Sequence, residues 1–457
     1  MDLETDVLVI GGGMAGLVAG IRSQESGAET TLIRKGQSAT SYSSGAIDVS
    51  GYLPGGSQQL LSAREGIEAI TSLYPLHPYG ILGFGSADND DISGLAIERV
   101  TQSVEWLMKH LKSTPAQLYG GVDSNLEGIT LLGTKKPTAM LQQTLWPGAF
   151  AVDDDGIMLF LGIKGAQELN PKIASKTFLE NQARIAEPPH KVANALVDIA
   201  PFGHTHNLST TNIARFLDRE ENMIAFVKQV KNKAEQFGAT YVALPSILGL
   251  EENLRNQSAL EEATDAKAFE LLSFPPSVPG FRLQKSLESV FVETGGHLLI
   301  GHEAEPCNIE GSRITEVSAR SPGRRVRIST KSVVLATGKY IGGGIAADVE
   351  GLRENVFDLM TVTEGFRESG RTRPQRLTNV VSLSPESHPL FGCGLSVDHF
   401  LRPVNPDGHV AAENLFAAGS ILAGYNYAME KSGLGVALAT GYYAGEAAAS
   451  NVAEGGG

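Results

Sequence analysis

Three glycines near the start of the chain, Gly11, Gly13 and Gly16, are spaced as GxGxxG and directly follow a short apolar run. In such a motif the first glycine allows a tight turn, the second lets backbone approach a pyrophosphate, and the third lets a helix pack on a strand. The free N–H groups at the start of that helix would hold the phosphates. The position of the motif predicts a dinucleotide site that includes Met14 and Ala15.

The residues after the second strand depart from the usual dinucleotide pattern. That strand normally ends in an acid that binds the adenosine ribose, whereas here Thr30–Ile33 is followed by Arg34 and Lys35. An arginine at this point can accept a 2′-phosphate, as in an NADP site. The alternatives are an adenosine held in another way, a flavin mononucleotide, or a solvated strand end. The sequence leaves them open.

Two further glycine turns favour a flavin over a nicotinamide. Thr337 and Gly338 follow a buried apolar strand, and Gly419 and Ser420 follow another one before the last helix. This arrangement resembles the two-dinucleotide flavoproteins, in which the N-terminus of the last helix points at the flavin pyrimidine ring. The positive end of the helix would stabilise negative charge on the reduced ring. The residues expected at the flavin there are Gly433, Leu434, Gly435 and Val436.

A run rich in small hydroxyl and glycine residues follows the second strand, from Lys35 to Asp48. It resembles the loop that lines the flavin ring in the fumarate reductase and succinate dehydrogenase superfamily. A polar surface loop is the alternative. The loop residues expected at the ring are Ser43, Ser44, Gly45 and Ala46.

The elements that would position these motifs alternate in α/β order. The first strand, the glycine turn, a helix ending near Gly27 and the strand Thr30–Ile33 make one parallel crossover unit of about 30 residues. From about residue 115 to 275 the pattern changes to mixed strands, paired prolines and polar turns. We therefore predict a discontinuous two-dinucleotide-binding, Rossmann-like α/β flavoprotein domain, residues 1–114 and 276–457, with an inserted α+β cap domain over 115–275.

Composition limits the partners and the metals. The 457 residues include 37 Lys and Arg against 51 Asp and Glu, a formal net charge of −14. Nucleic acid and anionic membrane surfaces need a basic patch, so neither is expected as the main partner. Two cysteines, Cys307 and Cys393, are too few for a disulfide framework or a self-contained iron–sulfur cluster. No third ligand accompanies His204 and His206, so no metal is expected there.

The apolar runs and the start of the chain bear on localisation. No run reaches the ~20 residues that a membrane span needs. The acidic segment Met1–Asp6 differs from the basic start of a signal peptide. We expect a cytoplasmic protein.

Six groups of segments occur in a fixed order along the chain. They are Gly36–Ala39 with Ser43–Gly45, His77–Tyr79, Asn212–Asp218, Pro275–Val278 with Arg282–Gln284, Val397–Asp398 with Leu401–Pro403, and Gly419–Ser420. In this order they resemble the B-subunit family of anaerobic glycerol-3-phosphate dehydrogenase over nearly the whole chain. Divergence is greatest from about residue 85 to 205. At Met429–Gly435 the chain departs from the pattern, because a more glycine-rich turn is expected there.

The resemblance implies a flavoprotein, described with FMN, that is joined by an FAD-bearing A subunit and an iron–sulfur C subunit. It implies that the complex oxidises sn-glycerol 3-phosphate to dihydroxyacetone phosphate and passes electrons to quinone. It also implies that the chain lies at the inner face of the cell membrane through a partner subunit. The glycine motif is built for a pyrophosphate and favours FAD, so the choice between FAD and FMN stays open.

Oxidation of a secondary alcohol beside a flavin needs a base for the hydroxyl proton and cations for the phosphate. Arg215, Arg282 and Arg402 lie in segments that carry the resemblance, and arginine is the natural bidentate partner of phosphate. A structural ion pair is the alternative for each. His77 and His388, each followed by proline, are the candidate bases, with a structural histidine as the alternative for both.

Three functions follow from these observations. The first is the catalytic flavoprotein subunit of glycerol-3-phosphate dehydrogenase. The second is an electron-transfer or assembly subunit of that complex, with no substrate site of its own. The third is a stand-alone flavin oxidoreductase that acts on a dicarboxylate, as fumarate reductases do.

Overall fold

The computed structural model describes residues 2–85, 91–151, 156–182, 191–199, 207–349, 351–363, 377–382, 384 and 387–455. The strands are β1 (Asp2–Ile10), β2 (Thr30–Arg34), β3 (Leu118–Gly120), β4 (Leu126–Ile129), β5 (Lys135–Thr138), β6 (Met140–Gln142), β7 (Ile157–Ile163), β8 (Lys191–Val197), β9 (Tyr241–Leu244), β10 (Lys267–Glu270), β11 (His297–Ile300), β12 (Glu303–Ala304), β13 (Glu316–Ser321), β14 (Arg324–Leu335), β15 (Ile345–Ala347), β16 (Leu352–Glu354) and β17 (Leu415–Ala417).

The α-helices are α1 (Met14–Glu25), α2 (Ala63–Leu73), α3 (Pro78–Gly83), α4 (Ile92–His110), α5 (Pro147–Phe150), α6 (Pro171–Gln182), α7 (Thr210–Leu217), α8 (Glu220–Phe237), α9 (Asn253–Thr264), α10 (Val278–Glu293), α11 (Tyr427–Glu430) and α12 (Gly433–Glu454). Short 3₁₀ turns are η1 (Ala39–Tyr42), η3 (Pro389–Gly392) and η4 (Gly419–Ile421).

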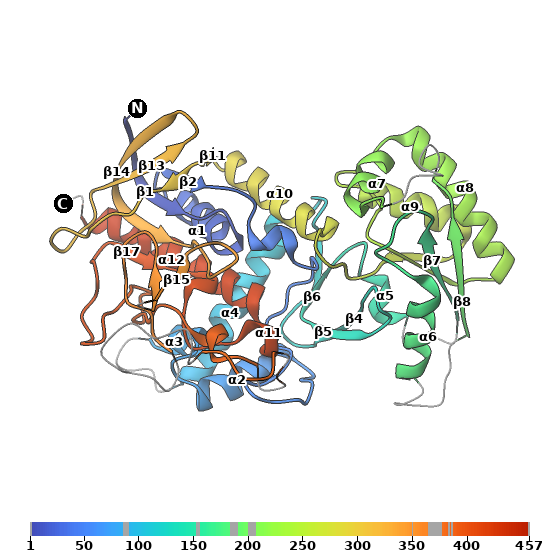
Figure 1. Ribbon diagram of the computed structural model, residues 1–457, viewed down its shortest axis with the longest axis horizontal. Coiled ribbons are helices and arrows are strands. Elements are labelled where there is room, and N and C mark those ends of the chain that lie inside the picture. Colours follow the sequence, from blue (N-terminus) through green and yellow to red (C-terminus); the bar gives the residue numbers. More distant parts are fainter. Residues whose placement is uncertain are drawn as a thin grey trace.

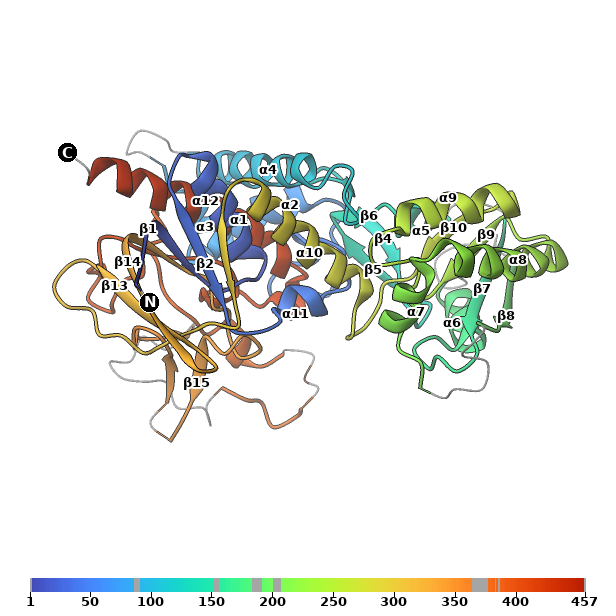
Figure 2. The same ribbon diagram turned by 90° about the horizontal axis from the view of Figure 1, so that it is seen from above.

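The molecule is elongated and has two lobes (Figure 1). The larger lobe contains both ends of the chain, drawn in blue and red, and the smaller lobe is built from the middle of the chain, drawn in green. The hairpin of β4 and β5 lies between them in both views (Figure 2). The boundaries predicted at residues 115 and 275 stay a prediction.

The larger lobe is organised around a seven-stranded sheet with the order β11-β2-β1-β14-β13-β12, in which β17 also pairs with β14. Strands β11, β2, β1, β14 and β17 are parallel, whereas β12 and β13 continue the sheet in antiparallel pairing. The run Val7–Ile10 in β1 is almost fully buried between β2 and β14. A strand that is covered on both faces is continuously apolar, as this run is. Strands β1 and β2 flank α1 in the chain and pair in parallel, so the predicted parallel crossover unit at the N-terminus is confirmed.

Two helices of small residues pack closely in this lobe. A Cβ on Gly441 or Gly445 of α12 would come within 2.5 or 2.3 Å of the backbone of Ala15 or Ala19 in α1. The absence of side chains at these glycines lets the two backbones approach. The middle of α12 is thereby held against the first two turns of α1.

The smaller lobe has a four-stranded sheet of its own. Its sheet, in the order β10-β9-β7-β8, is parallel throughout and alternates with helices, which is an α/β arrangement. Side chains of β7 alternate between two cores: Leu159 and Leu161 face one, while Met158 and Phe160 face the other. Residues 115–275 also contain the antiparallel pairs of β3 with β6 and of β4 with β5, so the inserted region combines helices with both parallel and antiparallel strands.

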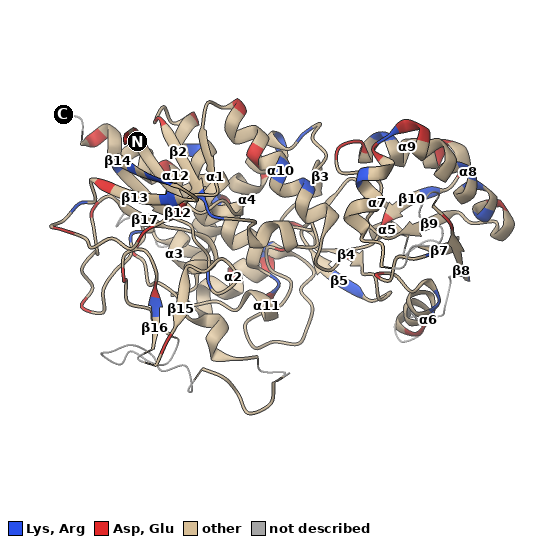
Figure 3. Ribbon diagram, turned by 45° about the horizontal axis from the view of Figure 1, so that its top comes forward, with Lys and Arg blue, Asp and Glu red and all other residues tan. Residues whose placement is uncertain are grey.

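The positions of the charged residues and the hydropathy of the helices can be read from the structure. Figure 3 shows acidic and basic segments interspersed along α8 and α9 of the smaller lobe. Within the described part of the chain, none of the helices combines the length and the hydropathy needed to cross a bilayer.

Candidate functional site

The predicted glycine turns meet at one cavity, which we call the main cavity. It has a volume of about 1050 Å³, at the upper end of the range for small-molecule sites. It lies beyond the carboxyl ends of β1, β2, β14 and β17, the edge at which open parallel sheets bind ligands. Predicted residues that line it are Gly11, Gly13, Met14, Ala15, Arg34, Lys35, Ser43, Ser44, Ala46, Thr337, Gly338, Ser420, Gly433 and Leu434.

The other five predicted cofactor residues lie behind the cavity wall. A Cβ on Gly16 would come 1.9 Å from the Gly11 carbonyl oxygen, and one on Gly435 would come 2.6 Å from Val49 Cα. These glycines therefore allow close backbone packing. The remaining three residues are also tightly packed against neighbouring elements. They are Gly45, Gly419 and Val436.

The turn before α1 has the shape that a phosphate cradle requires. Gly11 has a φ of +118°, and a Cβ there would come 2.2 Å from the Ala336 carbonyl oxygen. Gly13 occupies the N-cap position of α1, and the Met14 N–H donates to Thr40 Oγ1 at 2.8 Å. Thr337 Oγ1 is buried and has no hydrogen-bond partner among the described residues. The backbone can therefore approach a pyrophosphate closely at this turn.

Arg34 is ion-paired at the end of β2. Its Nη2 lies 2.9 Å from Glu288 Oε1, both side chains are 7% exposed, and its Nη1 donates to the Gly36 carbonyl oxygen. Gln284 Nε2 donates both to Glu288 and to the Gly12 carbonyl oxygen. The charge of Arg34 is thus balanced by an acid on α10. The interpretation of Arg34 as a free 2′-phosphate ligand is therefore disfavoured.

Charged residues from β12 to β14 complete this end of the cavity. Glu303 accepts from Lys35 at 2.7 Å and from Arg320 at 3.3 Å. The Lys35 hydrogen bond is the main reason that the pKa of Glu303 is lowered. Arg325 pairs with Glu305 at 2.5 Å. Glu303, Glu305, Arg320 and Arg325 could not be predicted as site residues, because no local sequence pattern marks them.

The opposite end of the cavity is formed around the N-terminus of α12. Lys136 pairs with Asp48 at 2.5 Å, and the Asp48 carbonyl oxygen accepts from the Gly435 N–H. Tyr427 and Lys339 also belong to this wall. Burial lowers the pKa of Lys339 to about 7. This end therefore combines a positive helix end with two lysines.

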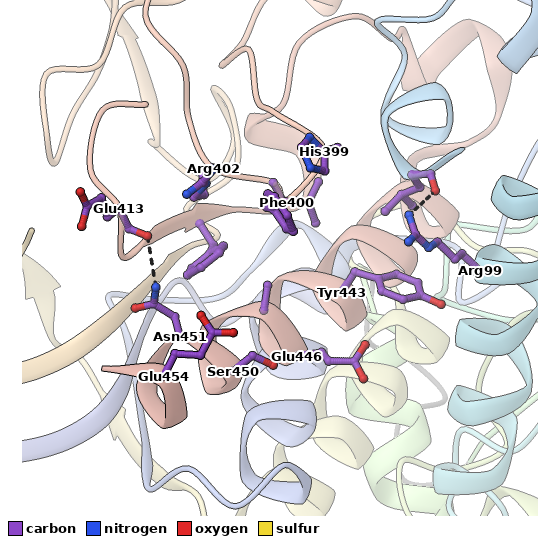
Figure 4. A pocket seen from close by; sticks show the side chains of 14 residues that line it. Arg99, His399, Phe400, Arg402, Glu413, Tyr443, Glu446, Ser450, Asn451 and Glu454 are labelled. Atoms are coloured by element: carbon purple, nitrogen blue, oxygen red, sulfur yellow. Dashed lines mark hydrogen bonds between the residues drawn. The ribbon is translucent and has the colours of Figure 1, made fainter. Parts of the chain in front are cut away.

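The three candidate phosphate ligands lie elsewhere. Arg282 is buried and makes a bidentate ion pair with Glu270. Arg215 is exposed on α7 of the smaller lobe. Arg402 lines a separate side cavity of about 360 Å³ (Figure 4). Its Nη2 lies 2.7 Å from Asp398 Oδ2. The ion-pair alternative thus describes Arg282 and Arg402, and all three lie outside the main cavity wall.

Both candidate bases are structural histidines in this fold. His77 is fully buried; its Nδ1 accepts from the Tyr79 N–H, and its Nε2 lies 3.1 Å from Glu430 Oε2. His388 Nδ1 accepts from the Asn379 N–H, and its Nε2 lies 2.9 Å from the Ser382 carbonyl oxygen. Neither lines the main cavity. His204 and His206 lie outside the described residues.

The Glu430 carboxylate predicts a pH effect on stability. Burial raises its pKa, but hydrogen bonds from His77, the Asn426 N–H and Ser432 outweigh this and hold the pKa below its usual value. A depressed folded pKa stabilises the chain above the unfolded pKa of about 4.3, and this stabilisation is lost as the pH falls through the folded pKa. Glu430→Gln is expected to lower the free energy of unfolding by ~1–3 kcal/mol at pH 7.

The effect of Glu430→Gln should shrink as the pH falls below about 4. Urea denaturation at pH 7 and in acid measures it. The exposed Glu262→Gln is the control, for which no change beyond about 0.5 kcal/mol is expected. If Glu430→Gln lowers the free energy of unfolding by the same amount at both pH values, this would contradict stabilisation of the fold by the ionised carboxylate.

The chain matches a family model and several named relatives in sequence, and it is similar in fold to solved structures. A family model described as "FAD binding domain" matches residues 6–436. The B subunit of anaerobic glycerol-3-phosphate dehydrogenase from Vibrio cholerae is 30% identical over 449 residues, 97% of this chain and 96% of its own length. Its Pasteurella multocida counterpart is 31% identical over 456 residues, 97% of this chain and 99% of its own. The solved 3-ketosteroid delta1-dehydrogenase of Sterolibacterium denitrificans covers 98% of this chain and 99% of its own, with 12% identity and a TM-score of 0.43.

Proposed function

Because this chain belongs to the FAD binding domain family and, within it, to the B-subunit family of anaerobic glycerol-3-phosphate dehydrogenase, we propose that it is a catalytic flavoprotein subunit that oxidises sn-glycerol 3-phosphate to dihydroxyacetone phosphate. One observation carries the proposal. The turns predicted for a flavin meet at one cavity, and 97% of this chain matches the Vibrio cholerae B subunit.

The cofactor of this family of flavin oxidoreductases is FAD, so FAD replaces both the FMN that the resemblance implied and the NADP alternative. The main cavity fits it, because the open turn at Gly11 and Gly13 leaves room for a pyrophosphate. The turn before α1 would hold the phosphates. The N-terminus of α12, at Gly433 and Leu434, would face the flavin ring. When bound, FAD accepts the two electrons that leave the alcohol.

The lysine-bearing end of the main cavity suits an anionic substrate. Lys136 and Lys339 lie in its wall together with the positive end of α12. In a chain of net charge −14, local cations are needed to attract a phosphate ester. Lys136 and the N-terminus of α12 would bind and orient the phosphate ester, while the cavity walls exclude water.

Partner subunits would carry the electrons onward. Relatives of this chain are named as the B subunit of an enzyme, which implies further subunits. With two cysteines in the whole chain, this protein cannot supply a four-cysteine cluster. We infer an FAD-bearing A subunit and an iron–sulfur C subunit that hold the chain at the inner, cytoplasmic face of the membrane.

A second candidate function is an electron-transfer or assembly subunit of the same complex. The favouring observation is that Arg215, Arg282 and Arg402 all lie outside the main cavity wall. In that case the substrate would bind to a partner subunit.

The proposal is tested by isolating the tagged chain from its own cells under anoxia, together with the chains bound to it. The expected result is reduction of an artificial dye that depends on sn-glycerol 3-phosphate, with co-purified subunits in a fixed ratio. Dye turnover linked to succinate or fumarate by this chain alone would contradict the proposal. It would favour the stand-alone dicarboxylate oxidoreductase.

A further inference from the structure

Lys339 is a buried amine in the wall of the main cavity, and no motif of the sequence pointed to it. It follows Gly338 at the end of β14, and its side chain is 3% exposed. Its Nζ donates to the Phe391 carbonyl oxygen at 2.5 Å and lies 5.0 Å from the centre of the Tyr425 ring. The amine is therefore held in place by a carbonyl group and an aromatic face.

Few charges act on this amine. Among the described residues, Glu430 and Cys393 are the groups whose charge would raise its pKa, and burial outweighs both. The Glu430 carboxylate already accepts hydrogen bonds from Ser432 and the Asn426 N–H and contacts His77. Burial raises the pKa of the Cys393 thiol, so it stays neutral at pH 7. The Lys339 amine is thus both neutral and ammonium in comparable amounts near pH 7.

The other ionisable side chains at this end of the cavity are less suited to accept a proton. Asp48 is engaged by Lys136 at 2.5 Å. Burial raises the pKa values of Tyr340 and Tyr427, so both remain protonated. The ring of His302 lies at the opposite end, beside Arg34, with Nδ1 3.0 Å from the Ile300 carbonyl oxygen.

We propose that Lys339 is the general base that removes the hydroxyl proton of the substrate; this inference rests on the proposed function. The O–H bond breaks and its proton goes to the lone pair of Nζ, while the oxygen retains the bonding electrons and forms the C=O double bond. The neighbouring C–H bond breaks, and its electron pair leaves as hydride to the bound cofactor. The ammonium returns its proton to water after the ketone has left. A buried lysine with a pKa near the working pH is suited to this task.

The decisive variants are Lys339→Met, which has a similar length and no charge, and Lys339→Arg, which stays charged. Lys331→Met is the matched control, because Lys331 is on the same strand, β14, is 65% exposed, pairs with Asp6 at 2.8 Å and lies outside the main cavity wall. Stopped-flow mixing with sn-glycerol 3-phosphate from pH 6 to 9 measures the rate of flavin reduction. The rate in the native chain is expected to rise through pH 7. Both Lys339 variants should be slower by about 10²-fold or more and lose this rise, whereas Lys331→Met should keep both the rate and the rise.

A second readout needs no substrate. Titration of the amine should perturb the visible absorption of the oxidised flavin near pH 7, and Lys339→Met should abolish the change. If the flavin of Lys339→Met is reduced at the native rate and with the native pH profile, the inference is overturned. If the native flavin is not reduced at all, the proposed function fails. A substrate-free titration near pH 7 that persists in Lys339→Met would then also overturn the assignment of the amine.

Discussion

Replacement of Gly13 by alanine is expected to release FAD from a chain that still folds. A Cβ at this position would lie 3.6 Å from Ser38 Cβ and Thr40 Oγ1, which is ordinary contact distance. The free energy of unfolding without cofactor should therefore fall by about 1 kcal/mol or less. The new methyl group would occupy the place where the backbone approaches the pyrophosphate. We expect FAD affinity to drop at least tenfold, about 1.4 kcal/mol.

Gly16→Ala is the matched comparison for Gly13→Ala. Its Cβ would lie 1.9 Å from the Gly11 carbonyl oxygen, so the strand, turn or helix must shift. This variant should lose stability by ~4 kcal/mol or more even without FAD. Urea denaturation of the apo chain and fluorescence titration with FAD separate the two effects. Unchanged FAD affinity in Gly13→Ala would show that the pyrophosphate does not lie at this turn.

Arg282→Met is expected to destabilise the whole chain. The guanidinium Nη1 and Nη2 lie 2.6 and 2.9 Å from the two carboxylate oxygens of Glu270, and both side chains are fully buried. Arg282 Nε also donates to the Gly249 carbonyl oxygen at 2.7 Å. Removing one partner of a buried pair leaves an uncompensated charge and costs about 3–5 kcal/mol. Because Arg282 is on α10 and Glu270 on β10, the loss also weakens the junction of the lobes.

The control for Arg282→Met is the exposed pair of Arg64 and Asp123, with 46% and 77% of their side chains exposed. Arg64→Met should cost no more than about 1 kcal/mol. The double variant Arg282→Met, Glu270→Met should recover much of the lost stability, since no buried charge remains. Urea denaturation measures all three. Native stability of Arg282→Met, with a raised KM for sn-glycerol 3-phosphate, would favour the phosphate-binding alternative instead.

The parts of the site that the sequence predicted are those formed by backbone. The turns at Gly11, Gly338 and Gly433 follow strands or begin helices, and parallel strands bring their carboxyl ends to one edge. Local pattern is sufficient for such positions. The α/β class of the larger lobe is confirmed for the same reason, because its buried strands are short continuous apolar runs.

The side chains at the site were harder to predict because their partners are distant in sequence. Arg34 pairs with Glu288, 254 residues later, and Lys339 acquires its properties from burial against Tyr425 and Phe391. Neither pairing nor burial of a single polar residue leaves a periodic signal. Motif position made Arg282 a candidate phosphate ligand with a structural ion pair as the alternative, and only the buried pair with Glu270 distinguishes the two.

The smaller lobe shows a different limit of pattern analysis. Its edge strand β8 alternates between exposed and partly buried residues, as an antiparallel strand with one wet face does. Only the pairing with β7 shows it to be parallel. The pattern thus indicated mixed strands where the fold has βαβ units.

The most direct test of the central claim is the visible absorption of the full-length chain, purified alone with FAD under anoxia, before and after addition of sn-glycerol 3-phosphate. If the main cavity holds both cofactor and substrate, the flavin absorption should bleach in the absence of any partner. An oxidised spectrum that stays unchanged with substrate, but bleaches with dithionite, would contradict this account. It would assign the oxidation to a partner and leave this chain an electron carrier.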